Sequence, residues 1–327
     1  MEQDPPEQPA HSIDQETPEQ PAVSAQENPF SNRGRLVTGL ACVACSLVFI
    51  GLMQEPDPDS WNTLSRYGYL PAVAIWDGRY WALLSSVFVH RELVHFAFNV
   101  YWLWILGRAL ERVIGPLRFL AFFIGSAVVS SGIQLAVGGS TGIGASGVVY
   151  AIFGFLWMAS DCIEAFKNTV TKRLVVTFLG WGVICILGTL LGTMNIGNAA
   201  HIGGLLFGAG VAMVFVKKRV RVMTAAGLVG LILIALVPLF WSPWSPDWTS
   251  KQAYDAHLRH DYVGAVIWYQ RTIDRGGNTV WALENMARAY GSMGDQTRYE
   301  ETLDRLRLRD SEAAERVEQV RRAANTK

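Results

Sequence analysis

Long apolar stretches alternate with short polar connections through the middle of the chain, from about residue 36 to residue 241. A helix that crosses a bilayer needs about 20 mostly apolar residues. The stretches of this kind are 36–53, 93–110, 117–137, 146–160, 174–194, 199–216 and 222–241. This pattern predicts an all-α polytopic membrane protein with seven spans, of which the fourth is too short to cross the bilayer by itself.

Basic residues gather in every second connection between these stretches. Arg33 and Arg35 precede the first stretch, and further basic residues lie at or after the ends of the second, fourth and sixth: Arg108, Arg112, Arg118, Lys167, Lys172, Arg173, Lys217, Lys218, Arg219 and Arg221. The connections 138–145 and 195–198 contain no basic residue. Because Lys and Arg favour cytoplasmic loops, the amino terminus is expected in the cytoplasm and the segment after the seventh span outside.

The two ends of the chain differ from its apolar middle. Residues 1–30 contain no Lys or Arg, and the phrase PEQPA occurs at both 6–10 and 18–22, which is typical of a disordered tail. In residues 249–327, Ala253 and Ala287 lie 34 residues apart, as do Ala256 and Tyr290. This spacing is the tetratricopeptide period, with a generic helical hairpin as the alternative. The predicted domains are a tail (1–34), a six-span domain (35–218), a seventh span with an interfacial linker (219–248) and a small soluble helical domain (249–327).

Composition agrees with this organisation and narrows the function. Charged residues make up 17% of the chain, whereas soluble domains have about 25%. The formal net charge is zero, which gives no electrostatic argument for a nucleic acid partner. The expected partner is the lipid bilayer. The cysteines all lie in apolar stretches and are interpreted as small buried hydrophobes.

Four polar residues stand out within the spans, where such groups indicate function. They are His95 and Asn99 in the second span, Ser146 at the start of the fourth and His201 at the start of the sixth. At a rise of about 1.5 Å per residue, His95, Ser146 and His201 each lie roughly 20–24 Å from the nearest charged residue on the cytoplasmic side. That depth is a few ångströms below the outer face of a hydrocarbon core about 30 Å thick.

Ser146 and His201 together predict nucleophilic catalysis, because a serine hydroxyl needs a base to remove its proton. No Asp or Glu is expected inside the spans, so a third orienting residue is either absent or replaced by packing, for which Tyr150 is the candidate. Asn99, His95 and the amide of Ser146 are candidate donors to an oxyanion. The Gly-rich stretch before Ser146 is expected to line a wet recess. Glycines that permit a strained turn or close helix packing support the site: Gly144, Gly147, Gly204 and Gly208.

These residues occur in motifs that resemble the rhomboid proteases over about residues 36–216. The motifs are His95-Phe-Ala-Phe-Asn99, Gly144-Ala-Ser146-Gly147 and Ala200-His201-Ile-Gly-Gly204 with Gly208, and they appear in the family's order on spans two, four and six. His90 and the stretch Arg79-Tyr80-Trp81 are also similar to the family. The resemblance implies a six-helix rhomboid-like bundle and a Ser–His serine endopeptidase that cleaves transmembrane or juxtamembrane segments of other membrane proteins, with no cofactor or metal.

By the same resemblance, Ser146 is the nucleophile, His201 the base, and His95 and Asn99 belong to the oxyanion site. The seventh span and the helical domain, with a possible protein partner, also resemble some bacterial members, so a plasma or inner membrane is expected. Three alternatives stay open. They are a non-catalytic client-binding adaptor, a transporter, and a zinc metalloprotease that uses His90, His95 and His201.

Overall fold

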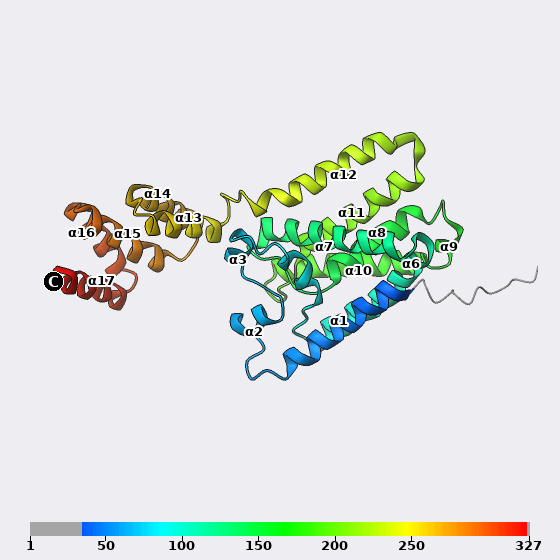
Figure 1. The fold of residues 1–327 in the computed structure, drawn as a ribbon, viewed down its shortest axis with the longest axis horizontal. Helices are drawn as coiled ribbons and strands as arrows, with labels where there is room; N and C mark the ends of the chain where they lie inside the picture. The colour runs from blue at the N-terminus through cyan, green and yellow to red at the C-terminus, as the bar shows by residue number, and fades with distance from the viewer. Residues whose placement is uncertain (1–34, 326–327) are drawn as a thin grey trace, which may run out of the picture. The chain divides into compact units, whose positions relative to one another are not determined.

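A computed structural model of the 327-residue chain describes residues 35–325, with side chains up to residue 323 (Figure 1). The predicted tail, residues 1–34, lies outside this described part. The described residues form helices joined by turns and loops, and no strand occurs among them. The all-helical fold class predicted from the sequence is therefore confirmed.

Six helical segments are long and apolar enough to span a membrane. They are α1 (Leu36–Met53), Leu93–Ile114, α7 (Pro116–Gly138), α10 (Lys172–Leu190), α11 (Asn198–Val216) and Lys218–Leu239. The second comprises α5 (Leu93–Trp102), a π-turn and α6 (Arg108–Ile114), and the last comprises α12 (Arg221–Leu236) with a 3₁₀ turn at each end. The seventh apolar helix, α8 (Ser146–Ala159), is short, as the sequence predicts. The chain is thus a multi-pass membrane protein.

Helix α8 lies at the centre of the bundle and is buried along almost its whole length, with residues such as Val148, Ile152 and Phe155 at most 1% exposed. Helices α7 and α11 pack against it (Figure 1). The outer helices instead expose large apolar side chains, for example Leu187 on α10 and Val222 on α12. Such surfaces suit contact with lipid tails.

A buried carboxylate lies inside one of the spans, where the sequence predicted no Asp or Glu. The second span continues to Ile114 and so contains Glu111, which is fully buried. Its oxygens accept hydrogen bonds from the backbone N–H groups of Val37 and Thr38, both at 2.9 Å, and from the Thr38 hydroxyl at 2.6 Å. Glu111 therefore caps the amino-terminal end of α1, where a negative charge also opposes the helix dipole.

The long segment after α1 is folded into short helices: α2 (Trp61–Arg66), α3 (Ala72–Trp76) and α4 (Ala82–Ser85), which a 3₁₀ turn at Ser86–Phe88 follows. Ile75 and Leu83 join Leu135 and Leu239 in a buried apolar cluster. The indole N–H of Trp76 donates to the carbonyl of Pro238 at 2.9 Å. This segment is thus anchored to the end of the last span.

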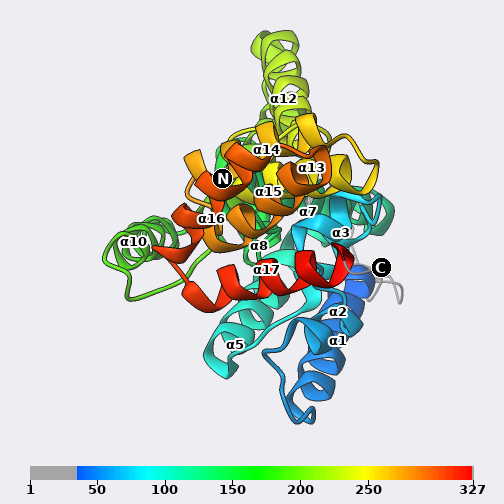
Figure 2. The same cartoon turned by 90° about the vertical axis from the view of Figure 1, so that its left-hand side faces the viewer.

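The residues after the spans form five helices: α13 (Pro246–Leu258), α14 (Tyr262–Asp274), α15 (Thr279–Met293), α16 (Gln296–Arg307) and α17 (Ser311–Asn325) (Figure 2). Asp261 and Asp295, 34 residues apart, cap α14 and α16 by accepting a hydrogen bond from the backbone N–H three residues on. Ala253 and Ala287, separated by the same interval, are both fully buried. The two helix pairs therefore repeat with the period found in the sequence, while their assignment as tetratricopeptide-like stays a prediction. The remaining helix, α9 (Glu164–Lys167), is a single turn after α8.

Candidate active site

Ser146 and His201 meet although 55 residues separate them. Ser146 is the first residue of α8, and His201 lies in the first turn of α11. The serine Oγ and the histidine Nε2 are 2.8 Å apart, a hydrogen-bond distance, and His201 is 7% exposed. This contact between the two helices is the one the sequence predicts, and it places a proton acceptor directly on the serine hydroxyl.

Glycines let α8 and α11 approach closely enough for this contact. A Cβ atom added to Gly204 would collide with the carbonyl oxygen of Gly147, and one added to Gly208 would collide with that of Ala151. A Cβ atom on Gly147 would lie 2.6 Å from the Ser130 hydroxyl. Backbone therefore packs against backbone along this interface, as expected of a small-residue stripe.

The ring of His201 is held by packing. Tyr150, one turn below Ser146 on α8, stacks on it with ring centroids 4.5 Å apart and an interplanar angle of 16°. The Tyr150 hydroxyl donates to the carbonyl of Phe178 on α10 at 3.0 Å. His201 Nδ1 is buried, and no hydrogen-bond partner for it exists among the described residues. Of the two options left open by the sequence, aromatic packing is the one found.

The turn that leads into Ser146 is held by hydrogen bonds. Gly144 has a φ of +94°, a conformation that favours glycine, and its N–H donates to the carbonyl of Ser86 at 3.1 Å. The N–H of Ala145 donates to Nε2 of His90 at 3.3 Å, while Nδ1 of His90 lies 3.2 Å from the carbonyl of Phe88. His90 must be neutral to accept this bond, so it acts as a fixed support beneath the serine turn.

His95 and Asn99 lie on α5 beside this turn. A Cβ atom on Gly144 would come within 2.6 Å of the His95 ring, so glycine is required where the two meet. Asn99 is 2% exposed, and its amide donates to the carbonyl of His95 at 2.8 Å. Within the described residues no hydrogen bond joins either side chain to Ser146. Their role as oxyanion donors therefore stays a prediction. No cluster of three or more potential metal ligands occurs in the part of the chain that the structure describes.

Residues 77–218 match the model of the rhomboid domain. The chain therefore contains a rhomboid domain. The matched residues contain both halves of the Ser146–His201 contact, whereas α13–α17 lie beyond them.

Curated relatives support the same conclusion. "Rhomboid protease GlpG" from Salmonella choleraesuis (strain SC-B67) is 30% identical over 180 residues, which is 55% of this chain and 62% of that protein. The proteins of the same name from Salmonella newport (strain SL254) and Salmonella heidelberg (strain SL476) match with the same identity and coverage. The chain thus spans about 62% of the length of the curated relatives it matches.

An apolar cavity of about 160 Å³ adjoins His201 in the rhomboid domain. It lies between α10 and α11, and Phe178, Val183, Ile186 and Leu205 are among its lining residues. The cavity therefore places apolar space next to the imidazole, where a side chain of a bound polypeptide could fit.

The sequence reasoning did not identify Gln134, near the end of α7, as part of the site. Its side-chain oxygen accepts a hydrogen bond from the backbone N–H of Ala200 at 3.2 Å. Its side chain also lies against Gly142, in the serine turn, and Gly197, the residue before α11. Gln134 therefore joins the turn before Ser146 to the start of the helix that carries His201. The only sequence signal was a long polar side chain within an apolar span.

Proposed function

We propose that this rhomboid-domain protein is an intramembrane serine endopeptidase that cleaves transmembrane or juxtamembrane segments of other membrane proteins. The observation that carries the proposal is the 2.8 Å contact between Ser146 Oγ and His201 Nε2 within a bundle of membrane helices. The family match and the relatives named as proteases support it.

The proposed reaction is acyl transfer followed by hydrolysis. His201 Nε2 takes the Ser146 proton as Oγ attacks the scissile carbonyl. The resulting tetrahedral intermediate collapses when the imidazolium gives that proton to the leaving amine. A water molecule, deprotonated by the same imidazole, then attacks the acyl-enzyme. The imidazolium returns this proton to Ser146 Oγ as the ester bond breaks, which releases the new carboxylic acid and regenerates the serine.

The oxyanion of that intermediate needs hydrogen-bond donors. The backbone N–H of Ser146 is one, because the first N–H groups of a helix have no partner within the helix. The Asn99 amide has two N–H donors, and the bond to the His95 carbonyl uses one of them. The other donor of Asn99 and the ring of His95 complete the proposed oxyanion site.

The proposed substrate position follows from the surroundings of His201. The apolar cavity between α10 and α11 has room for a small apolar side chain next to the scissile bond. The alternation of basic connections supports an orientation with the amino terminus in the cytoplasm and α13–α17 outside a plasma or inner membrane. The site would then open towards the outer face, where water can enter. The residues at the site need no cofactor for this chemistry.

The test is cleavage of a panel of single-span membrane proteins by the purified chain in liposomes. Ser146→Ala and His201→Ala are compared with the matched variants Ser160→Ala and His260→Ala, since Ser160 ends α8 and His260 lies between α13 and α14. The first two are expected to lose cleavage while keeping the wild-type helix content. Full cleavage by Ser146→Ala would refute the proposal. Substrate binding by a wild-type chain that never cleaves would instead favour the client-binding adaptor.

A further inference from the structure

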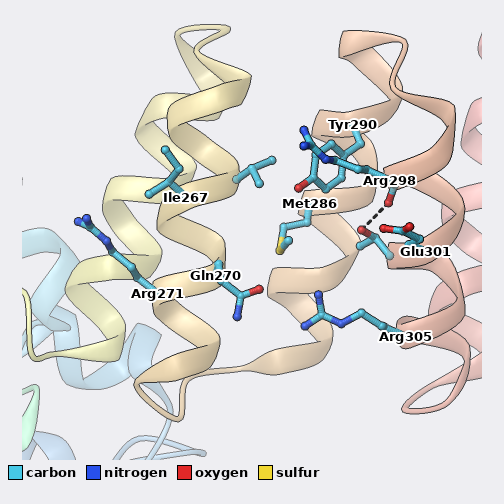
Figure 3. A pocket seen from close by; sticks show the side chains of 10 residues that line it. Ile267, Gln270, Arg271, Met286, Tyr290, Arg298, Glu301 and Arg305 are labelled. Carbon is cyan, nitrogen blue, oxygen red and sulfur yellow. Dashed lines mark hydrogen bonds between the residues drawn. The ribbon is translucent and has the colours of Figure 1, made fainter.

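A second cavity lies in the carboxy-terminal helices and is larger than the one beside His201. It measures about 450 Å³ and lies between α14, α15 and α16 (Figure 3). Val266 and Ile267 of α14 and Met286 of α15 give it an apolar wall. Ile267, a large apolar side chain, is 50% exposed to solvent.

Basic groups border this apolar surface. Figure 3 shows the Arg305 guanidinium on α16 extending towards the Gln270 amide on α14, across the opening between the two helices. Arg298, one further arginine on α16, lies over the ring of Tyr290 with 5.9 Å between the guanidinium carbon and the ring centroid. Arg271 also borders the cavity, but it points away from the opening and stacks on Trp268.

These arginines are poorly neutralised. Within the described part of the chain, Arg305 has no ion pair. Arg298 has one, in which its guanidinium nitrogen lies 3.4 Å from a carboxylate oxygen of Asp295. Glu301 is the single acidic side chain among the described residues that line the cavity. Without Arg271, which points away, the lining therefore carries two positive charges and one negative charge.

The spacing of the two α16 arginines specifies a ligand geometry. Seven residues of helix separate Arg298 from Arg305, which corresponds to about 10.5 Å along the axis. Three residues of an extended chain span about 10 Å. In an extended segment of polyproline II conformation, which has three residues per turn, side chains at positions i and i+3 also share one face, about 9 Å apart. Two carboxylates at these positions therefore match both guanidinium groups, and an apolar side chain between them can enter the apolar part of the cavity.

We propose that the cavity between α14, α15 and α16 is a binding site for an extended acidic peptide segment of another protein, with carboxylates at positions i and i+3. Arg298 and Arg305 bind the carboxylates, Gln270 bonds the peptide backbone, and Met286 contacts the intervening apolar side chain. The excess of positive charge in the lining is what selects an acidic occupant.

The proposal is tested by fluorescence anisotropy with the full chain in neutral detergent micelles, carrying Ser146→Ala so that no peptide is cut. The probe is a labelled peptide with the core Asp-Leu-Ser-Asp, compared with Lys-Leu-Ser-Lys and with Asp-Asp-Leu-Ser. The first peptide is expected to bind best, and its affinity should fall as salt rises, because exposed charges are screened. Its binding should weaken about tenfold in Arg298→Gln and in Arg305→Gln, since each loses a charged hydrogen bond.

Two further variants sharpen this test. Arg309→Gln is the matched control, because Arg309 lies beyond the end of α16 and outside the cavity lining. It should leave binding unchanged, and Glu301→Gln should tighten it about two- to threefold by removing the opposing charge. Since these side chains are exposed, all variants should keep the wild-type circular dichroism.

Three results would overturn the proposal. They are equal binding of the Asp and Lys peptides, full binding by the Arg298→Gln/Arg305→Gln double variant, and no binding of the Asp peptide at millimolar concentration. Arg305-dependent binding to phosphatidylglycerol vesicles without peptide binding would reassign the basic groups to a membrane surface. Peptide binding is measured without proteolysis, so its failure would leave the proposed protease activity untouched.

Discussion

The phenol ring of Tyr150 lies flat on the imidazole of His201, and it is anchored through its hydroxyl to the backbone of a third helix at Phe178. Since His201 Nδ1 has no hydrogen-bond partner among the described residues, this stacking supplies the orientation that a polar third residue would otherwise give. The ring position thus depends on the packing of α8, α10 and α11 together.

Removing the stacked ring should reduce turnover. Tyr150→Ala leaves the imidazole free to rotate, and a misplacement of about 1 Å can cost on the order of 10²-fold in rate. Tyr150→Phe keeps the stack and loses only the hydrogen bond to Phe178, so it should retain most of the activity. Steady-state cleavage of one single-span substrate by both variants checks this, and equal losses in the two would show that the hydroxyl, rather than the ring, is what matters.

Gln134 should act as a positioning residue. Gln134→Ala removes the acceptor of the Ala200 N–H at the start of α11, which should lower kcat about threefold to tenfold, as expected for one lost hydrogen bond. KM should change little, because the side chain has no assigned contact with substrate. Both kcat and KM of the variant are measured, together with its thermal unfolding midpoint. A raised KM with an unchanged kcat would contradict the assignment.

The glycine interface should tolerate no side chain. In Gly208→Ala the new methyl group meets the Ala151 carbonyl, so the helices must separate or distort. Overpacking of this kind typically costs about 1–3 kcal/mol. The matched control is Gly227→Ala on α12, where a Cβ atom meets nothing within 4 Å. Thermal unfolding in detergent should show a large drop for the first variant alone, and equal midpoints would be the contrary outcome.

The sequence predicted those parts of the molecule that depend on local pattern. The seven apolar helices followed from hydropathy, and the depth of Ser146 and His201 in their spans predicted that they meet. The stripe of Gly204 and Gly208 predicted close helix packing because residues four apart share one helix face. Each of these features can be predicted from one segment of the sequence, or from polar residues that lie at equal depth in different spans.

The long-range contacts that support the site and the bundle could not be predicted in this way. The pairs Gln134–Ala200, His90–Ala145 and Glu111–Thr38 join residues 66, 55 and 73 positions apart. Each depends on how a loop or helix end is placed in three dimensions, about which apolar periodicity says nothing. Glu111 was missed for a further reason, since the apolar stretch ends at residue 110 but the helix continues to Ile114.

Loss of the Glu111 carboxylate should destabilise the bundle without affecting the chemistry. Glu111→Ala leaves the buried N–H and hydroxyl of Thr38 and the partly buried N–H of Val37 without an acceptor. An unsatisfied buried group costs about 1–3 kcal/mol. Glu164→Ala is the control, because the Glu164–Lys167 pair is largely exposed and such pairs contribute about 0–1 kcal/mol. The unfolding midpoint should fall only for Glu111→Ala, with cleavage at low temperature close to wild type. A wild-type midpoint would mean that other acceptors replace the carboxylate.

The carboxy-terminal helices should lose stability as the pH falls, because of His257. Burial, the positive charge of Arg288 and the neighbouring His260 lower the pKa of His257 below its usual 6.5. In the folded chain its Nδ1 lies 3.1 Å from the Tyr269 hydroxyl. As pH drops through about 6.5, the unfolded state gains this proton before the folded state does, so the contribution of neutral His257 is present above that pH and is lost below it.

Hydrogen exchange measures this effect in the full chain. After correction for intrinsic exchange rates, protection of α13 and α14 should be weaker at pH 5.5 than at pH 7.5. His257→Gln has no proton to gain, so its protection should vary less between the two pH values, although its protection at pH 7.5 can be lower than that of the wild type. The same pH dependence in the variant and the wild type would assign the change to another group.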